Sequence, residues 1–377
     1  MHFILMKLTG LIYRLILKPL MFKFSTPDSA HEKMIRFGAW AGRHPSLIGL
    51  LKFSTKFNSP MLRTLAFLRS FDSPIGFAAG IDKNAEITRC IEGVGFNFAT
   101  YGSMTAEICP GNHKPWFHRL PKYKSMMIHV GLANNGIEAN LENLMRAYDE
   151  AETILPGVSI ARTNIPHSST SITAGVKDFT KSFKLLQGNV GLIEVNISCP
   201  NAYCGEQFGE PQALEKLLSA LDKIPRTAPV VLKMPSDQAW PEFKKLIDVA
   251  LEHNVQGITI CNLRKDRTGM EIPETWKGNL SGKPVQNISD DLVAQSFLYL
   301  RGRLVIIGLG GVFTAKDAYR KIRLGADLVE IASALMYEGP QVVSEIKRGL
   351  VKLLKRDGFT SIMQITGIDA QKLLSEN

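Results

Sequence analysis

The chain has 377 residues, of which 45% are apolar, enough for one large domain with an appendage. Its five cysteines lack the paired spacing of a metal site, which favours reduced thiols in a protein that faces the cytosol. A net charge of +10 calls for an anionic partner, either nucleic acid or an anionic membrane surface. No nucleic-acid-binding motif accompanies the charge, so the membrane surface is the favoured partner.

The first 24 residues alternate apolar clusters with cations. No acidic residue precedes Asp28. The cations are Lys7, Arg14, Lys18 and Lys23. The longest uncharged run is too short for a bilayer span, which needs about 20 residues, and no small-residue cleavage site of a signal peptide follows. We expect an interfacial helix whose lysines reach the lipid headgroups. A small helical subdomain packed on the main domain is the alternative.

A second helix is predicted to begin at a capping box in residues 29–32. Apolar residues recur behind it at helical spacing over residues 34–41. We therefore expect residues 1–70 to form a membrane-associating helical extension and residues 71–377 to form the catalytic domain.

From residue 75 onward, short β-branched runs alternate with amphipathic stretches. Eight runs predict strands at residues 75–79, 98–102, 158–162, 192–197, 230–234, 257–262, 304–308 and 328–332. The stretches between them predict helices, among them residues 84–94, 134–152, 213–221, 240–253, 289–300 and 315–324. This alternation predicts an α/β fold, a (β/α)8 TIM barrel. The insertion between the second and third strands, residues 104–157, is expected to add a hairpin beside the site.

In such a barrel, chemistry takes place where the strands end at the carboxyl face. Polar side chains collect at these ends: Lys83, Ser103, Asn196, Cys199, Asn201, Lys233, Asn262 and Ser333. After the fourth strand, Cys199 lies between the amides of Asn196 and Asn201. A thiol flanked by amides suits a base or nucleophile beside a polar ligand. The same cysteine could instead be a small buried hydrophobe.

Glycines follow the seventh predicted strand at residues 308–311, and Ala332 and Ser333 follow the eighth. Barrels bind phosphate at this position, with backbone N–H groups at the start of a short helix. Glycines also serve tight loops, but their register at strands seven and eight predicts a phosphate site.

Several segments together are similar to those of one family: residues 29–32, 77–84, 110–115, 196–201, 280–284, 306–311 and 338–340. On these segments the chain resembles the dihydroorotate dehydrogenases, and in layout their membrane-associated, quinone-using class. The resemblance implies FMN as cofactor and a quinone as electron acceptor. It also implies a role in pyrimidine biosynthesis.

The resemblance also implies roles for individual residues. Contacts to FMN are implied for Ala78, Ala79, Gly80, Ser103, Asn196, Lys233, Cys261, Gly282, Gly310, Gly311, Ala332 and Ser333. Lys233 would lie beside the N1–O2 edge of the flavin. Contacts to the substrate are implied for Lys83, Asn196, Asn201 and Asn262. Cys199 matches the catalytic base, on the face opposite the flavin whose N5 accepts a hydride. The polar residues of the quinone tunnel match His31 and Arg119.

The catalytic position departs from the pattern of the quinone-using class. That class typically has serine as its base, whereas this chain has Cys199. The reference pKa of a thiol, near 8.5, suits a base at cytosolic pH.

The substrate-binding positions also depart from the family. Ile128 and Leu132 replace an asparagine and an aromatic residue, and Leu263 replaces a threonine. An asparagine of the third strand aligns with Ile160, although a slip of a few residues would offer Asn164. Each lost polar partner costs about 1–3 kcal/mol. The substrate is therefore dihydroorotate or, slightly favoured, a less polar cyclic analogue. If the substrate is dihydroorotate, the side chains of Arg162, Arg264 or His129 would replace the lost polar contacts.

The sequence thus predicts an FMN-dependent oxidoreductase that acts on a CH–CH donor with a quinone acceptor. We expect a peripheral protein on the cytoplasmic face of a membrane, most simply a bacterial inner membrane, without bound metal or nucleic acid. Two alternatives remain: a soluble-type flavin enzyme linked to fumarate or a nicotinamide, and a non-enzymatic homologue that binds flavin or membrane.

Overall fold

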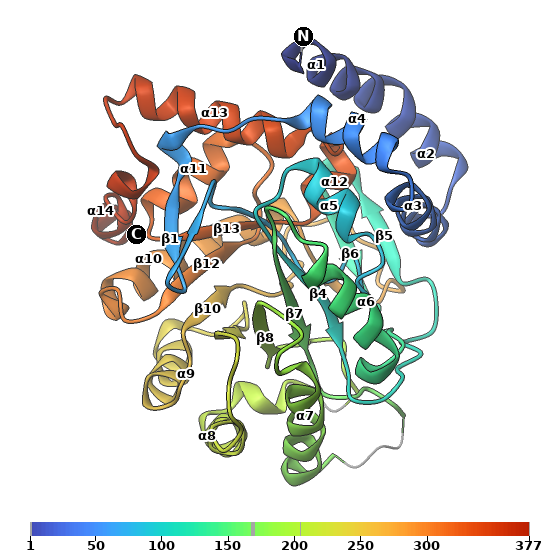
Figure 1. Cartoon of the computed structure of the whole chain (residues 1–377). Helices are drawn as coiled ribbons and strands as arrows, with labels where there is room; N and C mark the ends of the chain where they lie inside the picture. Colours follow the sequence, from blue (N-terminus) through green and yellow to red (C-terminus); the bar gives the residue numbers. More distant parts are fainter. Residues whose placement is uncertain (1, 167–169, 204, 377) are drawn as a thin grey trace.

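The computed structural model of the chain describes residues 2–166, 170–203 and 205–376. Eight parallel strands close into a barrel, in the order β10-β12-β13-β3-β4-β7-β8-β9 (Figure 1). Their bounds are β3 Ile75–Phe77, β4 Phe98–Met104, β7 Leu155–Ile160, β8 Leu192–Asn196, β9 Val230–Lys233, β10 Gly257–Ile260, β12 Val305–Leu309 and β13 Leu328–Ile331. Each predicted strand overlaps one of these, so the predicted TIM barrel is confirmed.

Helices surround the barrel (Figure 1). They are α5 Thr88–Val94, α6 Ile137–Asp149, α7 Ile172–Leu186, α8 Pro211–Leu221, α9 Trp240–Glu252, α10 Gln286–Leu300, α11 Ala315–Arg323, α12 Ser333–Glu338, α13 Val342–Arg356 and α14 Ala370–Glu376. Short 3-10 turns occur at η2 Pro60–Leu62, η3 Pro121–Tyr123, η4 Gln207–Gly209, η5 Lys283–Val285 and η6 Ile362–Ile365. The helix predicted from residue 84 begins only at Thr88, because the Asp82 carboxylate accepts the backbone N–H groups of Glu86 and Ile87, both at 3.0 Å.

A two-stranded hairpin, β1 Thr64–Ala66 with β2 Arg69–Phe71, covers the amino end of the barrel. Ala66 and Phe71 pack there against Phe98 and other buried residues at the beginnings of the barrel strands. The boundary expected at residue 70 therefore falls inside a hairpin that packs on the barrel.

The insertion after β4 does form a hairpin, as predicted. Its strands, β5 Phe117–Leu120 and β6 Ser125–Ile128, are antiparallel, and β11 Asn279–Leu280 adds a third strand from a distant part of the chain. In this small sheet Asn279 lies opposite Ile128.

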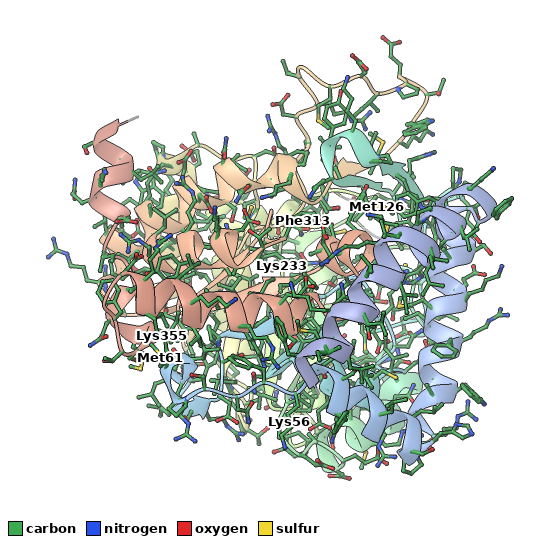
Figure 2. All side chains as sticks on the ribbon, turned by 90° about the horizontal axis from the view of Figure 1, so that it is seen from above. Lys56, Met61, Met126, Lys233, Phe313 and Lys355 are labelled. Carbon is green, nitrogen blue, oxygen red and sulfur yellow. The ribbon has the colours of Figure 1, made fainter. Side chains whose placement is uncertain are left out.

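The N-terminal helices are α1 His2–Ile12, the π-helical turn η1 Tyr13–Leu17, α2 Lys18–Phe24, α3 Pro27–Gly42 and α4 Pro45–Thr55. They lie together on one flank of the barrel (Figures 1 and 2). The predicted capping box at residues 29–32 is wrong: Thr26 is the N-cap, and its hydroxyl accepts the N–H of Ser29 at 3.2 Å. Pro27 favours this start because the first helical position needs no N–H donor.

Among the helices of residues 2–166, 170–203 and 205–376, none is both long and apolar enough to cross a bilayer. Many large apolar side chains of the N-terminal helices are nevertheless exposed. They include Phe3, Ile4, Leu8, Leu11, Leu15, Ile16, Leu17, Leu20, Phe24, Phe37, Trp40 and Leu50. We call this set the apolar face.

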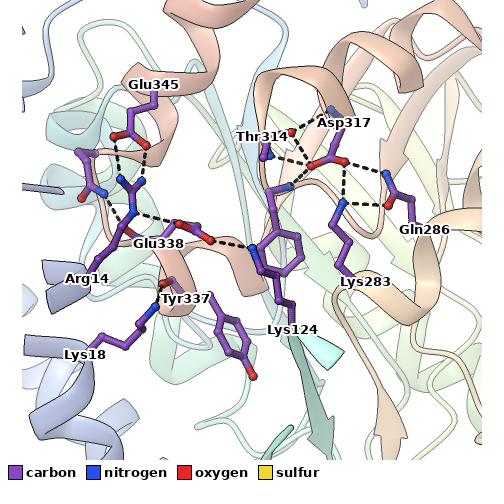
Figure 3. Close-up of polar contacts among 12 residues, drawn as sticks. Arg14, Lys18, Lys124, Lys283, Gln286, Thr314, Asp317, Tyr337, Glu338 and Glu345 are labelled. Atoms are coloured by element: carbon purple, nitrogen blue, oxygen red, sulfur yellow. Dashed lines mark hydrogen bonds and ion pairs between the residues drawn. The ribbon is translucent and has the colours of Figure 1, made fainter. Parts of the chain in front are cut away.

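Ion pairs hold the N-terminal helices on the barrel (Figure 3). Arg14 pairs with Glu338 at 3.0 Å and with Glu345, and Lys18 donates to the carbonyl of Tyr337 at 3.0 Å. Of the three lysines expected at lipid headgroups, Lys18 therefore binds the barrel instead, as Arg14 does, because α12 and α13 present carboxylates and a carbonyl to this side of the helices.

Candidate active site

Amide and hydroxyl groups form a connected chain at the carboxyl ends of the barrel strands. Asn196 Nδ2 donates to Ser103 Oγ at 2.9 Å, and that hydroxyl lies 2.8 Å from Ser159 Oγ. Asn262 Nδ2 donates to the Ser198 carbonyl at 2.6 Å and to Asn196 Oδ1 at 3.2 Å. Three residues singled out in the sequence, Ser103, Asn196 and Asn262, are thus brought together from three strands.

The polar position on the third barrel strand is Ser159, not Ile160. Ile160 is fully buried in the apolar core, because successive side chains of a strand point to opposite faces. Asn164 does not replace it: its Nδ2 donates to the Gly131 carbonyl at 2.9 Å, and its Oδ1 accepts the N–H of Tyr203 at 2.7 Å. Asn164 therefore holds two loops together.

Cys199 lies on the turn after β8 and is half-buried. It lines a cavity of about 20 Å³ with Leu132, Ala161 and Phe208. Burial raises the pKa of the Cys199 thiol to about 12, while the backbone N–H of Asn201 and the charge of Lys233 act in the opposite direction. This thiol is therefore harder to ionise than the reference value near 8.5 suggests, because burial disfavours its charged form.

Asn201 is oriented by the small antiparallel sheet. Its Nδ2 donates to the Ile128 carbonyl at 3.0 Å, and its Oδ1 accepts from Asn279 Nδ2 at 2.8 Å. Asn112 Nδ2 donates to the Asn201 carbonyl at 3.2 Å. Ile128 thus contributes its backbone rather than a side-chain amide, and Asn279 brings an amide beside it.

Sequence reasoning missed Asn279. The residue lies 151 positions after Ile128, and only the pairing of β11 with β6 brings the two together. The one signal that pointed to it is its place directly before the 280–284 segment of the family resemblance.

Of the two arginines named as replacements, Arg162 lines the cavity beside Cys199, whereas Arg264 is not among the residues that line it. Arg162 pairs with Gln207, and Arg264 donates to the Pro284 carbonyl at 3.0 Å and pairs with Asp266. His129 does join the amides, with Nδ1 3.4 Å from Asn112 Nδ2.

The two leucines that replace polar or aromatic residues differ in their surroundings. Leu132 is half-buried, has a positive φ of 63° and lines the cavity beside Cys199. The N–H of Leu263 donates to Asn262 Oδ1 at 2.9 Å, so its backbone orients a site amide.

Lys83 lies on the loop after β3, against two aromatic rings. Its Nζ is 5.1 Å from the ring centre of Trp116 and 5.4 Å from that of Phe117. Burial lowers the pKa of Lys83 to about 8, although Asp28 and Asp82 act in the opposite direction. The ammonium is thus a poorly hydrated cation that an anionic group would stabilise.

Glycines and hydroxyls lie at the ends of β3, β11, β12 and β13. Gly80, Gly310 and Gly311 have φ of 110°, 113° and 74°, and a side chain on Gly80 would point into open space. A side chain on Gly282 would lie 2.3 Å from the Lys124 carbonyl. Ser281 Oγ is 2.8 Å from Ser333 Oγ. Ala332 precedes that serine at the start of α12.

Lys233 lies at the end of β9, within the body of the molecule (Figure 2). Only 5% of the residue is exposed, and its closest ionic partner is Glu194 Oε1 at 3.6 Å, too long for a hydrogen bond. Cys261 at the end of β10 is buried, and burial raises the pKa of its thiol to about 12, so that this thiol is uncharged at neutral pH. Ala78 is fully buried and Ala79 is half-buried at the end of β3.

A second polar group lies between the barrel and the N-terminal helices. Arg119 Nη1 donates to the Ser25 carbonyl at 2.7 Å, and its guanidinium lies 4.6 Å from the ring centre of Phe22. Its buried Nε has no hydrogen-bond partner within the part of the chain that the structure describes. Tyr337, which sequence reasoning missed, packs edge-on against Phe22 at 5.8 Å.

His31 is on α3, close to the same loop as Lys83. Its Nε2 lies 2.8 Å from the carbonyl of Ile81, and its ring lies 5.4 Å from that of Phe117. Burial, followed by the charge of Lys83, lowers the pKa of His31 to about 4.

Three comparisons relate the chain to known proteins. Residues 61–354 match the model of a protein family described as dihydroorotate dehydrogenase. A protein of Roseiflexus castenholzii is 32% identical over 370 residues, covering 96% of this chain and 98% of the relative. A protein of Haloarcula marismortui is 35% identical over 309 residues, covering 81% and 85%. Both bear the name dihydroorotate dehydrogenase (quinone).

Among solved structures, the DHODH of Eimeria tenella in complex with ferulenol superposes with a TM-score of 0.82. The two sequences are 24% identical, and the match covers 95% of this chain and 98% of that one. This likeness supports the fold.

Proposed function

The chain belongs to the dihydroorotate dehydrogenase family and is an oxidoreductase, and from this premise we propose that it oxidises dihydroorotate, with FMN as its cofactor and a membrane quinone as electron acceptor. The observation that carries the proposal is the linked set of Ser103, Asn196 and Asn262 at the carboxyl end of the barrel, with Cys199 on the adjoining turn.

The residues present fit FMN. The glycines after β12 suit a phosphate because they offer close backbone approach, and Ser281 after β11 and Ser333 after β13 offer hydroxyl donors. Lys233 is a buried ammonium without a hydrogen-bonded acceptor in the described residues, which suits the oxygen and nitrogen acceptors of a flavin edge. FMN bound there would supply a hydride acceptor.

Cys199 is the proposed general base. The thiolate at Sγ takes the proton from one ring carbon of dihydroorotate while a hydride leaves the neighbouring carbon, so that a carbon–carbon double bond forms. Burial raises the pKa of this thiol to about 12 even though the backbone N–H of Asn201 and the charge of Lys233 favour the thiolate, so the thiolate that acts as base is the minor form at neutral pH.

The amides and Lys83 orient the substrate. Asn196, Asn201 and Asn262 offer donors and acceptors to the amide groups of the ring, and Asn279 holds Asn201 in place. Lys83 offers its poorly hydrated ammonium to the substrate carboxylate, an interaction that is strong because burial excludes competing water.

We further propose that quinone enters between the N-terminal helices and the barrel. Arg119 Nε is a buried donor without a partner among the described residues, and the rings of Phe22 and Tyr337 beside it would contact a quinone ring. The apolar face would lie in the membrane surface and give quinone a path from the lipid, so that the N-terminal helices α1 to α4 act as a membrane-associating extension. The protein would then be peripheral to a membrane, on its cytoplasmic face.

The proposal is tested with the purified full chain. We expect FMN to copurify near one per chain, to be bleached by dihydroorotate without oxygen, and to be reoxidised by a soluble quinone analogue. Asn262→Ala should slow the bleaching, whereas Asn287→Ala, at an exposed position on α10, should not.

Other outcomes would each contradict one part of the proposal: the substrate, the electron acceptor or the cofactor. FMN that dihydroorotate does not reduce would favour the less polar substrate suggested by Leu132 beside Cys199. Reoxidation by fumarate or a nicotinamide rather than quinone would identify the soluble-type alternative. A protein that binds no flavin would overturn the cofactor assignment.

A further inference from the structure

The interior of the barrel contains a polar layer beneath the proposed flavin site. Four alternate strands, β4, β8, β10 and β13, each contribute one residue: Thr100, Glu194, Thr259 and Glu330. All four are buried, with at most 1% exposed. Barrel interiors are usually built from such four-residue layers, filled by bulky apolar side chains. This layer is polar and carries two carboxyl groups.

Hydrogen bonds across the barrel connect the layer in two pairs. Thr100 donates to Glu330 Oε1 at 2.7 Å, and Thr259 donates to Glu194 Oε2 at 2.8 Å. Within the described residues, the remaining oxygen of each carboxyl group, Glu194 Oε1 and Glu330 Oε2, has no hydrogen bond. Lys233 lies on the strand between β8 and β10, with Nζ 3.6 Å from Glu194 Oε1.

The charges of this group do not balance unless a proton is added. Two carboxylates and one ammonium would leave a buried negative charge, which is costly in the interior of a protein. The charged groups that face Glu330 are Glu194 from β8 and Lys233 from β9, and Thr100 from β4 is its hydrogen-bond donor. Burial and the charge of Glu194 raise the pKa of Glu330 to about 8.

We propose that Glu194 and Glu330 are positioning residues for Lys233. Glu194 is the carboxylate that holds the ammonium, and Glu330 carries the proton that makes the group neutral. Together they set the net charge that the barrel presents to the flavin at Lys233, which is adjacent to Asn196 in the β8–β9 register. This inference rests on the proposed function, because FMN is the group whose reduction the charge would affect.

Two isosteric variants separate the roles of the carboxyl groups. Glu194→Gln, made together with Glu330→Gln so that Glu330 cannot ionise in place of Glu194, removes a buried negative charge, so the anionic reduced flavin should be favoured at pH 7. We expect at least a tenfold change in the equilibrium between oxidised and reduced FMN, about 30 mV for a two-electron couple. Glu330→Gln replaces a neutral acid by a neutral amide. At pH 7 its equilibrium constant between oxidised and reduced FMN should therefore stay within twofold of the wild-type value.

Measurements at pH 9 complete the test. There Glu330 of the wild type is ionised, and its added charge should make the flavin harder to reduce than in Glu330→Gln. The flavin takes up the same protons on reduction in both proteins, so this contribution to the pH dependence of the potential cancels when the two are compared. Equal shifts for both variants at pH 7, or wild type and Glu330→Gln with equal potentials at both pH values, would overturn the inference.

The FMN content of each preparation is measured first, so that the two proposals fail differently. Absence of flavin from the wild type counts against the proposed function. Infrared spectra of the flavin-free protein test the proton itself: the carbonyl band of a protonated carboxylic acid should be present at pH 7, should disappear towards pH 9, and should be missing in Glu330→Gln. A band that the variant retains contradicts the assignment to Glu330, whatever the flavin does.

Discussion

Cys199, the proposed base, has surroundings that oppose its ionisation. Burial raises the pKa of the thiol, and the Asn201 N–H and the Lys233 charge only partly offset this effect. Thiolate is therefore the minor form at neutral pH, and proton removal should become faster as its fraction grows. The pH dependence of flavin reduction thus reports directly on this residue.

In single-turnover reduction by dihydroorotate, we expect the wild-type rate to rise about tenfold per pH unit up to about pH 8, above which Lys83 loses its charge. Cys199→Ala should lower the rate about 10²–10⁴-fold, the usual contribution of a general base. Cys90→Ala, which alters a thiol between α3 and α5, is the control. A Cys199→Ala enzyme that retains the wild-type rate and pH profile would exclude this thiol as the base.

Asn279 provides a second prediction for a single residue. Asn279→Ala removes the donor that holds Asn201 Oδ1, so substrate binding should weaken by about 1–3 kcal/mol, a five- to 150-fold increase in KM. Asn287→Ala again serves as the control. An unchanged KM would mean that Asn201 does not need this amide to bind substrate.

At the level of elements, the N-terminal helices are held on the barrel by polar contacts as well as by packing. Arg14 and Lys18 bind residues of α12 and α13, and His31 of α3 binds the Ile81 carbonyl next to Lys83. These contacts connect the proposed quinone path to the loop that carries Lys83, the residue proposed to bind the substrate carboxylate, so α3 should be sensitive to the protonation of His31.

The pKa of His31 is about 4 in the folded protein and near 6.5 in an unfolded chain. The unfolded state therefore binds a proton more readily, and stability is lost as pH falls from 6.5 to 4, by at most about 3 kcal/mol. Denaturant unfolding at pH 7 and at pH 4.5 should show a smaller loss for His31→Asn than for wild type. His113→Asn, at an exposed site, should behave as wild type; identical losses in all three proteins would contradict the role of His31.

At the level of the whole molecule, the distribution of apolar surface is uneven. The apolar face includes Leu15 and Phe24, which are 66% and 71% exposed. Large apolar patches on a protein surface mark sites that bind another surface, and the surface proposed for the apolar face is that of a membrane.

Replacement of Leu15 and Phe24 together by glutamate should reduce sedimentation with anionic lipid vesicles at least tenfold, since each buried side chain contributes about 1.5–3 kcal/mol. The thermal midpoint should not change, because both side chains project into solvent. Met363→Glu, an exposed apolar residue of η6, is the matched control. Equal loss of binding in the control would show that added negative charge, rather than loss of the apolar face, is responsible.

Much of the fold could be predicted from local patterns. The eight barrel strands follow from β-branched runs, because strands covered on both faces are continuously apolar. Local patterns failed where a contact from elsewhere decided the outcome. Thr26 rather than residue 29 caps α3 beside Pro27, and the Asp82 carboxylate delays the start of α5 to Thr88.

The sequence by itself determined the barrel, the family and the residue types at the carboxyl ends of the strands, because these depend on short-range periodicity and on segments that are continuous in the chain. Only the tertiary structure decided that Ser159 rather than Ile160 faces Ser103, that Asn279 lies beside Asn201, and that Glu194 and Glu330 share the barrel interior with Lys233. Such contacts join residues far apart in the chain. Strand register and barrel closure, which involve the whole molecule, determine which of them meet.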